Sequence, residues 1–594
     1  MEDEIKTEVI IDFTEIETCT LNNSNGVEVI NLTGEISVKN PSDSRIWNGK
    51  LNLEGKETTN LENAEYAINE IKANDKWIKP YSMAEDLIES PILSIYEVID
   101  TYYESPAPNW AAIIDKRMPT AFHITAENNS ESTLKDIKVI KKLPEYFSEP
   151  ILEEANVTGT LSYDSGSHEI HWKIDGMEPN SKLEVTIRSG FTPSEPEPYG
   201  AGEIKATYTV LDTIRTKLEG SFFGNADNLF AVDVGESLDM PGSWECTAEF
   251  ENSSSLNTTL KKVKVIQSKE NTREIIIEEN PNAIVQINQS WTKNFDVKSE
   301  GVPKFKTEYV FSINSVIHRK ILGSITREEY IIPIVSIQIQ KTLEPPEVPA
   351  YAKNEVIVKL FINNIGSAAL NEFVIVDNIP QDFKPPEKGT IDFFIDSNEI
   401  KENISYEIEP NNEDPSLKHI LKIVIDNLNQ SIGGFKPKNQ LLIQYPIEAS
   451  NPQPKIEHKC PFEVSGNVAP PGPAIKPDIY DLEIGIKYVR RRIRALKQVQ
   501  PLGEGGQYKI PIIFQNKGEI LLENVIIKDI IPPNFQLLNW EPEDIKPEIN
   551  DLEDGGTQLI WKFLTVEASK KLNFGYTIKG TGEYIAPELE YNVD

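Results

Sequence analysis

Short runs in which apolar and polar residues alternate recur along almost the whole chain, and Val, Ile, Thr, Phe and Tyr are frequent in them. Clusters of Asn, Gly, Pro and Ser separate these runs, and helical periodicity is nearly absent. Alternation with a period of two predicts β-strands with one buried face, and the clusters favour turns. The pattern therefore predicts an all-β protein.

Three segments carry the same residues at the same offsets. In each, an Asn after a strand is followed by Gly or Ser two residues later, Leu after six, Pro after sixteen and Phe after nineteen. The sets are Asn516, Gly518, Leu522, Pro532 and Phe535; Asn364, Gly366, Leu370, Pro380 and Phe383; and Asn128, Ser130, Leu134, Pro144 and Phe147. Repetition in one register indicates a tandem array.

Two further segments match the repeat in part. Asn40, Ser42 and Ile46 keep the first spacing without the later Pro and Phe. Asn252 and Leu260 lie two residues further apart than in the other copies, which we attribute to a longer turn. With these copies the array has about five units.

Each repeated position has a physical role. Asn and Gly tolerate left-handed backbone and suit the turn between two core strands. The next strand alternates, as in Val525, Ile527 and Asp529, so we expect its apolar face to end where the strand leaves the core at the Asp. Pro then ends strand pairing, and the aromatic residue three positions later is expected to cover the end of the sandwich.

A second block of residues supports the same unit. Trp172 and Trp561 each stand 11 residues before a Leu, and related segments from Gly200 and Gly580 provide the last strand of their units. We therefore predict a tandem array of about five immunoglobulin-like β-sandwich domains, with a semi-rigid Pro-rich linker at 466–478. The predicted domains are 1–88, 89–217, 218–328, 329–470 and 471–594.

The strand, the Asn-x-Gly turn, the strand ending in Asp-x-Ile-Pro and the later Trp together resemble the conserved-repeat family called domain of unknown function eleven. Residues 330–383 and 508–578 match best. Members of that family are immunoglobulin-like sandwiches repeated in large archaeal and bacterial proteins, many of them at the cell surface. The resemblance implies the fold and an archaeal source, and it implies no catalytic residue.

Composition restricts the partners and the location. The 94 Asp and Glu against 59 Lys and Arg give a net charge of -35, which repels nucleic acid and anionic lipid surfaces. The start of the chain has no basic and apolar leader, and no apolar run approaches the roughly 18 residues that span a bilayer. Cys19, Cys246 and Cys460 are too far apart for one disulfide per domain, so we expect buried thiols in a reducing compartment. We expect a cytoplasmic protein.

No candidate for catalysis emerges from the sequence. It contains no phosphate-binding Gly-rich motif and no Gly-x-Ser-x-Gly elbow. His168 with His171, and His458 with Cys460, lack the further ligands that a metal needs. The acidic turn Asp551, Glu553 and Asp554 favours a plain hairpin over a calcium site. We therefore predict no enzyme, no cofactor and no metal.

One basic segment departs from the acidic background, and it contains Arg490, Arg491, Arg492 and Arg494. As the opening strand of the last domain, it would place Arg490, Arg492 and Arg494 on one face. These arginines either pair with acidic residues across the preceding domain junction or dock an acidic protein partner.

The leading hypothesis is a non-enzymatic scaffold that binds protein partners. The alternative is a cell-surface adhesin or envelope component, which the family habit and nine Asn-x-Ser/Thr acceptors favour. An enzyme with an unrecognised site ranks third, because a fold never excludes an activity.

Overall fold

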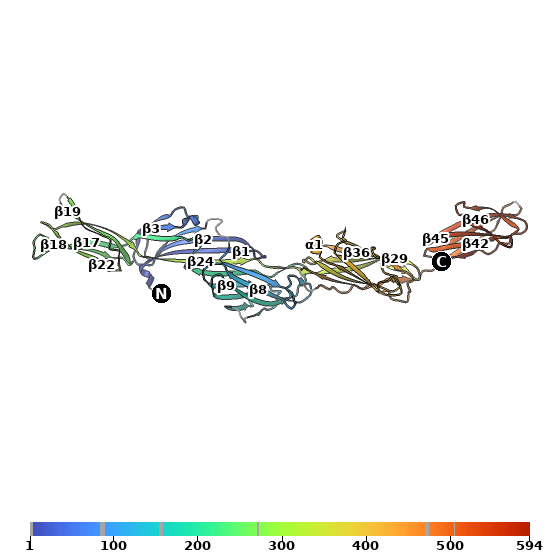
Figure 1. Cartoon of the computed structure of the whole chain (residues 1–594), viewed down its shortest axis with the longest axis horizontal. Helices are drawn as coiled ribbons and strands as arrows, with labels where there is room; N and C mark the ends of the chain where they lie inside the picture. The colour runs from blue at the N-terminus through green and yellow to red at the C-terminus, as the bar shows by residue number, and fades with distance from the viewer. Residues whose placement is uncertain are drawn as a thin grey trace. The chain divides into compact units, whose positions relative to one another are not determined.

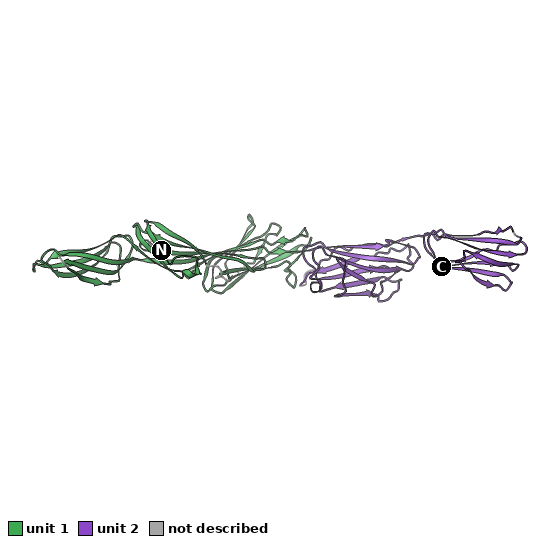
Figure 2. Ribbon diagram, turned by 90° about the horizontal axis from the view of Figure 1, so that it is seen from above, with its two compact units in different colours: residues 1–334, 470–473 green, residues 335–469, 474–594 purple. Residues whose placement is uncertain are grey.

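The computed structural model describes residues 4–83, 90–153, 158–269, 272–469, 474–503 and 505–593. Nearly all of their regular structure is β-strand, and the one α-helix in these ranges, α1 (Leu428–Ile432), is short. Two single-turn helices, η1 (Glu4–Thr7) and η2 (Lys56–Thr58), complete the helical content there. The chain is an all-β tandem array of immunoglobulin-like sandwiches, as predicted (Figure 1). It divides into two compact units, with residues 1–334 in unit 1 and residues 335–469 and 474–594 in unit 2 (Figure 2).

An eight-stranded sheet runs through unit 1. In spatial order its strands are β11 (Thr160–Asp164), β12 (Glu169–Met177), β9 (Leu134–Lys142), β15 (Ile204–Leu211), β24 (Ser315–Arg327), β1 (Val9–Leu21), β2 (Val27–Asn40) and β5 (Asp75–Ser82). β24 pairs with β1 in parallel along the whole of β1, and antiparallel with β15. The predicted domains 1–88 and 89–217 therefore share one hydrogen-bonded sheet through a strand from much later in the chain.

Two smaller sheets in unit 1 pack on this long sheet. One contains β16 (Glu219–Asn225), β3 (Ile46–Glu54) and β4 (Glu65–Ile71), and the other contains β10 (Ile151–Leu152), β13 (Lys182–Phe191), β8 (Met118–Asn128) and β6 (Leu93–Asp100). The Phe13 ring of β1 lies against Gly220 of β16, and Lys141 of β9 lies 5.1 Å from the Phe122 ring centroid of β8. Three two-residue strands lie outside these sheets: β7 (Ala112–Ile113), and β14 (Tyr199–Gly200) paired with β25 (Ile331–Ile332).

Another sandwich of unit 1 lies between β16 and β24 in the sequence. Its strands are β17 (Asn228–Glu236), β18 (Ser243–Asn252) and β22 (Ser290–Lys298) in one sheet, and β20 (Thr272–Glu279), β19 (Thr258–Lys269), β21 (Ala283–Val285) and β23 (Lys304–Ile313) in the other. Phe230, Phe250 and Leu260 are in its core. The predicted range 218–328 thus contains this sandwich and two strands, β16 and β24, that complete other sheets.

The first sandwich of unit 2 has two sheets. One contains β27 (Ile337–Glu344), β29 (Asn354–Asn364), β36 (Gln440–Ala449), β32 (Asp392–Ile395), β33 (Asn398–Glu399) and β31 (Phe383–Lys384). The other contains β34 (Ile404–Glu409), β35 (His419–Ile425), β30 (Glu372–Ile379) and β37 (Phe462–Asn467). Two short strands, β28 (Glu347–Pro349) and β38 (Gly485–Lys487), pair in parallel, and β26 (Ile334–Val335) precedes β27.

The segment after β37 returns along the same sandwich. The Phe462 N–H donates to the Tyr480 carbonyl at 2.9 Å, and the Ile475 N–H donates to the Gly466 carbonyl at 2.9 Å. Residues 475–487 therefore extend this sandwich, although the sequence predicted that they end a linker and begin the last domain. The boundary at 470–471 stays a prediction, because residues 470–473 lie outside the described part.

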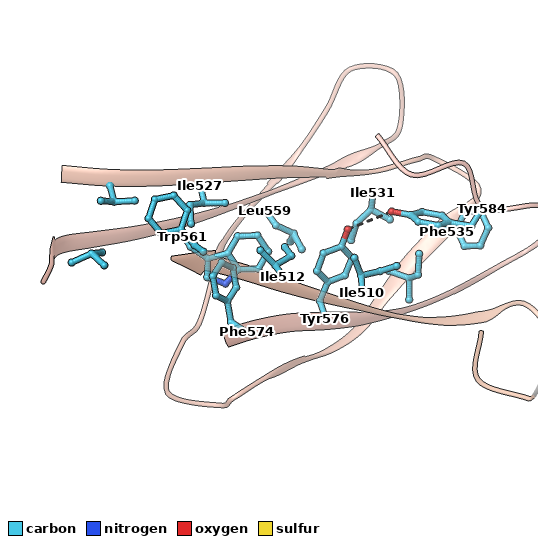
Figure 3. Close-up of a cluster of buried hydrophobic side chains, with 14 of the residues drawn as sticks. Ile510, Ile512, Ile527, Ile531, Phe535, Leu559, Trp561, Phe574, Tyr576 and Tyr584 are labelled. Atoms are coloured by element: carbon cyan, nitrogen blue, oxygen red, sulfur yellow. Dashed lines mark hydrogen bonds between the residues drawn. The ribbon is translucent and has the colours of Figure 1, made fainter. Parts of the chain in front are cut away.

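The last sandwich shows how the repeat builds a core. Its sheets are β39 (Ile493–Lys497), β40 (Gln500–Pro501), β41 (Gln507–Asn516), β46 (Lys571–Gly580) and β43 (Phe535–Glu541), and β44 (Glu548–Asp551), β45 (Thr557–Val566), β42 (Leu522–Ile531) and β47 (Glu590–Asn592). Figure 3 shows Trp561 beside Phe574, with ring centroids 4.9 Å apart, and Phe535 beside Tyr584 at the far end of the cluster. Burial of Phe535 confirms that this aromatic residue covers the end of the sandwich.

Candidate functional site

The repeated asparagine builds the same turn in all five copies. Its Nδ2 donates to the carbonyl four residues later and to a carbonyl of the neighbouring segment, while its Oδ1 accepts the N–H two residues later. Each side chain is at most 1% exposed. These asparagines are Asn40, Asn128, Asn252, Asn364 and Asn516. A buried amide that satisfies three backbone groups fixes the turn and the register of both strands.

The copy at Asn252 corrects one detail of the sequence analysis. Its turn has the same length as the others, because Asn252 Nδ2 donates to the Leu256 carbonyl four residues later. The position six residues after the Asn is occupied by Thr258, which is fully buried and pairs with Val285. Leu260 is one inward-facing position further along the strand, so no longer turn is needed.

The sequence analysis expected the aspartate of the repeat to lie where its strand leaves the core. The structure shows the opposite for Asp377 and Asp529, which both lie inside the core. Asp377 on β30 is fully buried, with Lys341 Nζ at 2.5 Å from its Oδ1 and the Tyr445 hydroxyl donating to its Oδ2. Lys341 also donates to the Cys460 carbonyl at 3.0 Å. Burial raises the pKa of the Asp377 carboxyl, and the Lys341 ammonium opposes that rise.

The last sandwich repeats this arrangement. Lys497 Nζ lies 2.6 Å from Asp529 Oδ1, and the Tyr576 hydroxyl donates to Asp529 Oδ2 at 2.8 Å. Lys497 donates in addition to the Pro587 carbonyl at 3.0 Å. Burial again raises the pKa of the aspartate. Both sandwiches of unit 2 thus hold a buried lysine, aspartate and tyrosine in contact.

Unit 1 contains the same pair with the charges exchanged. Lys141 lies thirteen residues after Asn128, as Asp377 does after Asn364, and its Nζ is 2.6 Å from Glu97 Oε1. Glu97 pairs with the residue four before Asn128. Lys341 occupies the equivalent position in its sandwich, because its partner Leu360 lies four residues before Asn364. No tyrosine donates to Glu97 in the described residues, and Arg327 Nη1 donates to its Oε2 at 2.8 Å.

A further buried polar cluster lies on β1. Glu15 and Glu17 point to the same side of the strand and are buried. The Tyr81 hydroxyl donates to Glu15 Oε1 at 3.1 Å, and the Tyr208 hydroxyl donates to Glu17 Oε1 at 2.6 Å. Arg215 donates to both carboxylates. Since every one of these acids has a hydrogen-bond donor, the cluster is satisfied as a structural feature.

The four arginines predicted to bind a partner lie at the start of the last sandwich. All four side chains are exposed, and none lies within 4.0 Å of a carboxylate in the described part of the chain. Only Arg494 is in the strand, β39, which begins at Ile493, so the expected common face of Arg490, Arg492 and Arg494 does not form as a strand face. The Lys517 N–H donates to the Arg492 carbonyl at 2.6 Å, which places this segment against the asparagine turn.

The other residues that the sequence analysis considered for metal binding lie in hydrogen bonds and turns of the fold. His458 Nε2 lies 3.1 Å from Asp382 Oδ2, and the Asp551–Asp554 region is a hairpin turn in which the Gly556 N–H donates to Asp554 Oδ1 at 2.9 Å. The three cysteines are buried, as predicted. Among the described residues no group of three or more His, Cys, Asp or Glu side chains is placed to hold a metal ion. Within the same ranges, no helix has the length and apolar character to cross a membrane.

No protein-family model and no curated protein matches this chain. Solved structures do. The major pilin SpaA of Corynebacterium diphtheriae is 9% identical, with a TM-score of 0.21, and the match covers 56% of this chain and 90% of the pilin. The C-terminal domain of the Streptococcus pyogenes antigen I/II-family protein AspA is 10% identical over 43% of this chain and 96% of that domain, with a TM-score of 0.21. The yeast δ-COP mu-homology domain bound to a Dsl1 peptide is 10% identical over 55% of this chain and 98% of that domain, with a TM-score of 0.23.

Proposed function

We propose that this chain is a non-enzymatic structural protein whose immunoglobulin-like sandwiches present binding surfaces to protein partners. The observation that carries the proposal is that the buried polar side chains lie inside the sandwich cores and bond to protein groups. The asparagine turns and the Lys, Asp and Tyr clusters are enclosed in sandwich cores, where they bond to one another and to the backbone. A substrate has no access to them, whereas edge strands and loops remain available for binding.

The arginine segment supports a specific docking surface. The chain carries a net charge of -35, yet the exposed side chains of Arg490, Arg491, Arg492 and Arg494 have no carboxylate within 4.0 Å in the described residues. β39 is an edge strand of its sheet. Unpaired basic side chains beside an open edge suit a protein partner with an acidic surface.

Charge reversal tests this function. Arg490, Arg492 and Arg494 are replaced by Glu in the full chain, and partners are recovered from a lysate of the native host at rising salt concentration. We expect loss of an acidic partner whose binding to the unaltered chain weakens as salt rises, because exposed charges are screened beyond about 10 Å at 0.1 M. The matched control reverses three exposed lysines of the same sandwich, Lys570, Lys571 and Lys579.

Two results of this experiment would count against docking. Partner recovery that is unchanged at every salt concentration would remove the arginine surface from the proposal. Faster proteolysis near residues 488–492 with unchanged recovery would instead support the alternative, in which the arginines hold the last domain to its neighbour.

A cell-surface or envelope role is the second candidate, and the exposed glycosylation acceptors favour it. Asn31, Asn288, Asn403 and Asn429 are exposed. Asn128 and Asn252 are turn asparagines and are fully buried, so a glycan on them would destroy the turn, and Asn156 lies outside the described residues. Protease treatment of intact cells and the glycan mass of the chain distinguish this candidate from an intracellular scaffold. Cleavage on intact cells supports the surface role, and full protection contradicts it.

A further inference from the structure

The lysine and aspartate of each unit 2 sandwich are close enough to react. In the fully buried pair Lys341 and Asp377, the amine nitrogen and a carboxyl oxygen are 2.5 Å apart. In the pair Lys497 and Asp529 this distance is 2.6 Å, and both side chains are at most 8% exposed. The two members of each pair come from the two facing sheets of the sandwich, and the packed core holds them together, which replaces a bimolecular encounter by a fixed contact.

We propose that Lys341 is joined to Asp377, and Lys497 to Asp529, by a covalent side-chain amide bond that forms in the folded core. The proposal is independent of the function proposed above. It assigns a chemical modification to the aspartate that the repeat places at the end of its strand and to a lysine that the repeat does not mark.

The reaction is a condensation that needs no other reactant. The neutral amine of Lys341 attacks Cγ of the protonated Asp377 carboxyl group, and a new Nζ–Cγ bond forms. One carboxyl oxygen then leaves as water, carrying away its own proton and one proton from Nζ. The products are one amide and one water molecule, so atoms and charges balance. No oxidant, reductant or metal is required.

The core favours the neutral form of both aspartates. Removal from water disfavours charged groups, and burial raises the pKa of both Asp377 and Asp529. The tyrosine hydroxyl that donates to the second carboxyl oxygen is placed to stabilise the negative charge that develops there during attack. We assign this catalytic role to Tyr445 and Tyr576.

The hydrogen-bond partners fit the amide product. An ammonium group has three donors, but among the described residues two acceptors face Lys341, Asp377 and the Cys460 carbonyl. After condensation the nitrogen keeps one N–H, which the Cys460 carbonyl accepts, and the amide oxygen accepts from Tyr445. In the other sandwich the Pro587 carbonyl and Tyr576 serve the same two positions.

Glu97 and Lys141 form an internal contrast. Their nitrogen and oxygen atoms are 2.6 Å apart and fully buried, but Arg327 donates to the other carboxylate oxygen at 2.8 Å. Arg327 thus occupies the carboxyl oxygen to which a tyrosine hydroxyl donates in each unit 2 sandwich, and no tyrosine donates to Glu97 in the described residues, so the group to which we assign catalysis is missing. We therefore expect no amide at this pair.

Intact-mass spectrometry of the denatured full chain tests the proposal. Each bond removes one water, so two bonds make the chain about 36 Da lighter than its sequence mass. Fragmentation after proteolysis should then recover two branched peptides, one joining Lys341 to Asp377 and one joining Lys497 to Asp529. A chain at its sequence mass overturns the proposal, and a deficit that maps to one pair overturns it for the other pair. A branched peptide at Lys141 overturns the role assigned to Arg327.

Variants identify the groups that react. Lys341→Met and Lys497→Met should each restore about 18 Da beyond the mass of the substitution itself, whereas Lys141→Met should restore nothing. Tyr445→Phe keeps the ring and removes the hydroxyl, so in freshly synthesised chains sampled over time the bond at Asp377 should close more slowly while the bond at Asp529 closes normally. Equal closure at both sites in that variant overturns the catalytic role of Tyr445. Because the mass of the unaltered chain decides the main question, a variant that fails to fold does not affect it.

Discussion

The asparagine turn supports the sharpest prediction about stability. In the last sandwich, Asn516 Nδ2 donates to the carbonyls of Ile520, Val566 and Glu567 at 2.7 to 3.1 Å, and Oδ1 accepts the Gly518 N–H at 2.9 Å. Asn516→Ala leaves several of these groups buried without a partner. Each such group costs about 1–3 kcal/mol, so the last sandwich should lose about 3 kcal/mol or more.

Hydrogen exchange read by mass spectrometry measures this loss in the full chain, where several sandwiches prevent a two-state analysis. Peptides from β41 and β42 should exchange roughly a hundredfold faster in Asn516→Ala, since about 1.4 kcal/mol corresponds to a factor of ten. Peptides from unit 1 should be unchanged.

Two further variants isolate the cause. Asn516→Asp keeps an acceptor for the Gly518 N–H but loses both donors and places a carboxylate against carbonyl oxygens, so its loss should equal or exceed that of the alanine variant. Asn550→Ala changes an exposed asparagine on the edge strand β44 and should alter exchange less than about threefold. If Asn516→Ala also falls below threefold, the turn does not hold the sandwich and the reasoning fails.

Two other predictions concern buried side chains. Burial raises the pKa of Cys19 and Cys460 to about 11. Iodoacetamide at pH 8 should therefore leave both thiols unlabelled in the native chain and label them after denaturation. Rapid labelling of the native chain would contradict their burial. Phe535→Ala removes the ring that packs on Tyr508 and Tyr584, and should cost the last sandwich about 3–5 kcal/mol of stability, measured by hydrogen exchange. Leu538→Ala, on the half-exposed face of the same strand, should cost far less. Equal losses would refute the capping role of Phe535.

The fold could be predicted because its signals are local. Alternation identifies strands, and the offset between Asn and its following residues identifies turns, so even the incomplete copy at Asn40 forms the expected geometry. The copy at Asn252 was misread because Thr258, a β-branched residue with a polar hydroxyl, occupies a position that Leu marks elsewhere. The backbone keeps this position in all five copies, while the residue that occupies it varies.

The shared sheet and the buried charges could not be predicted in the same way. β24 pairs with β1 although the whole of the inserted sandwich separates them in sequence, and neither strand carries a local sign of its partner. The aspartate of the repeat, Asp529 and its counterpart Asp377, was expected where the strand leaves the core, because a charged residue is rarely buried without a partner. The partners of Asp377 are Lys341 and Tyr445, which come from other strands, so the sequence hides the contacts that allow it to be buried.

In all five copies of the repeat, the residues at two core positions near the asparagine turn are matched to each other. The turn fixes the register of the strands that flank it. Two positions therefore face the core together. One is the residue thirteen after the Asn, and the other is the residue that pairs, on the neighbouring strand, with the residue four before the Asn. Besides the pairs Lys341 and Asp377, Lys497 and Asp529, and Glu97 and Lys141, the copies hold Phe13 with Leu53, and Val232 with Val265.

Every pair is either apolar on both sides or oppositely charged on both sides. An unpaired buried charge would cost several kcal/mol, so a single substitution to a charged residue at either position is strongly disfavoured and the two positions must change together. Where the pair is charged, a third side chain decides its chemistry. In the proposed reaction a tyrosine hydroxyl beside the carboxyl group favours condensation, and the pair in which an arginine takes the place of that hydroxyl stays uncondensed.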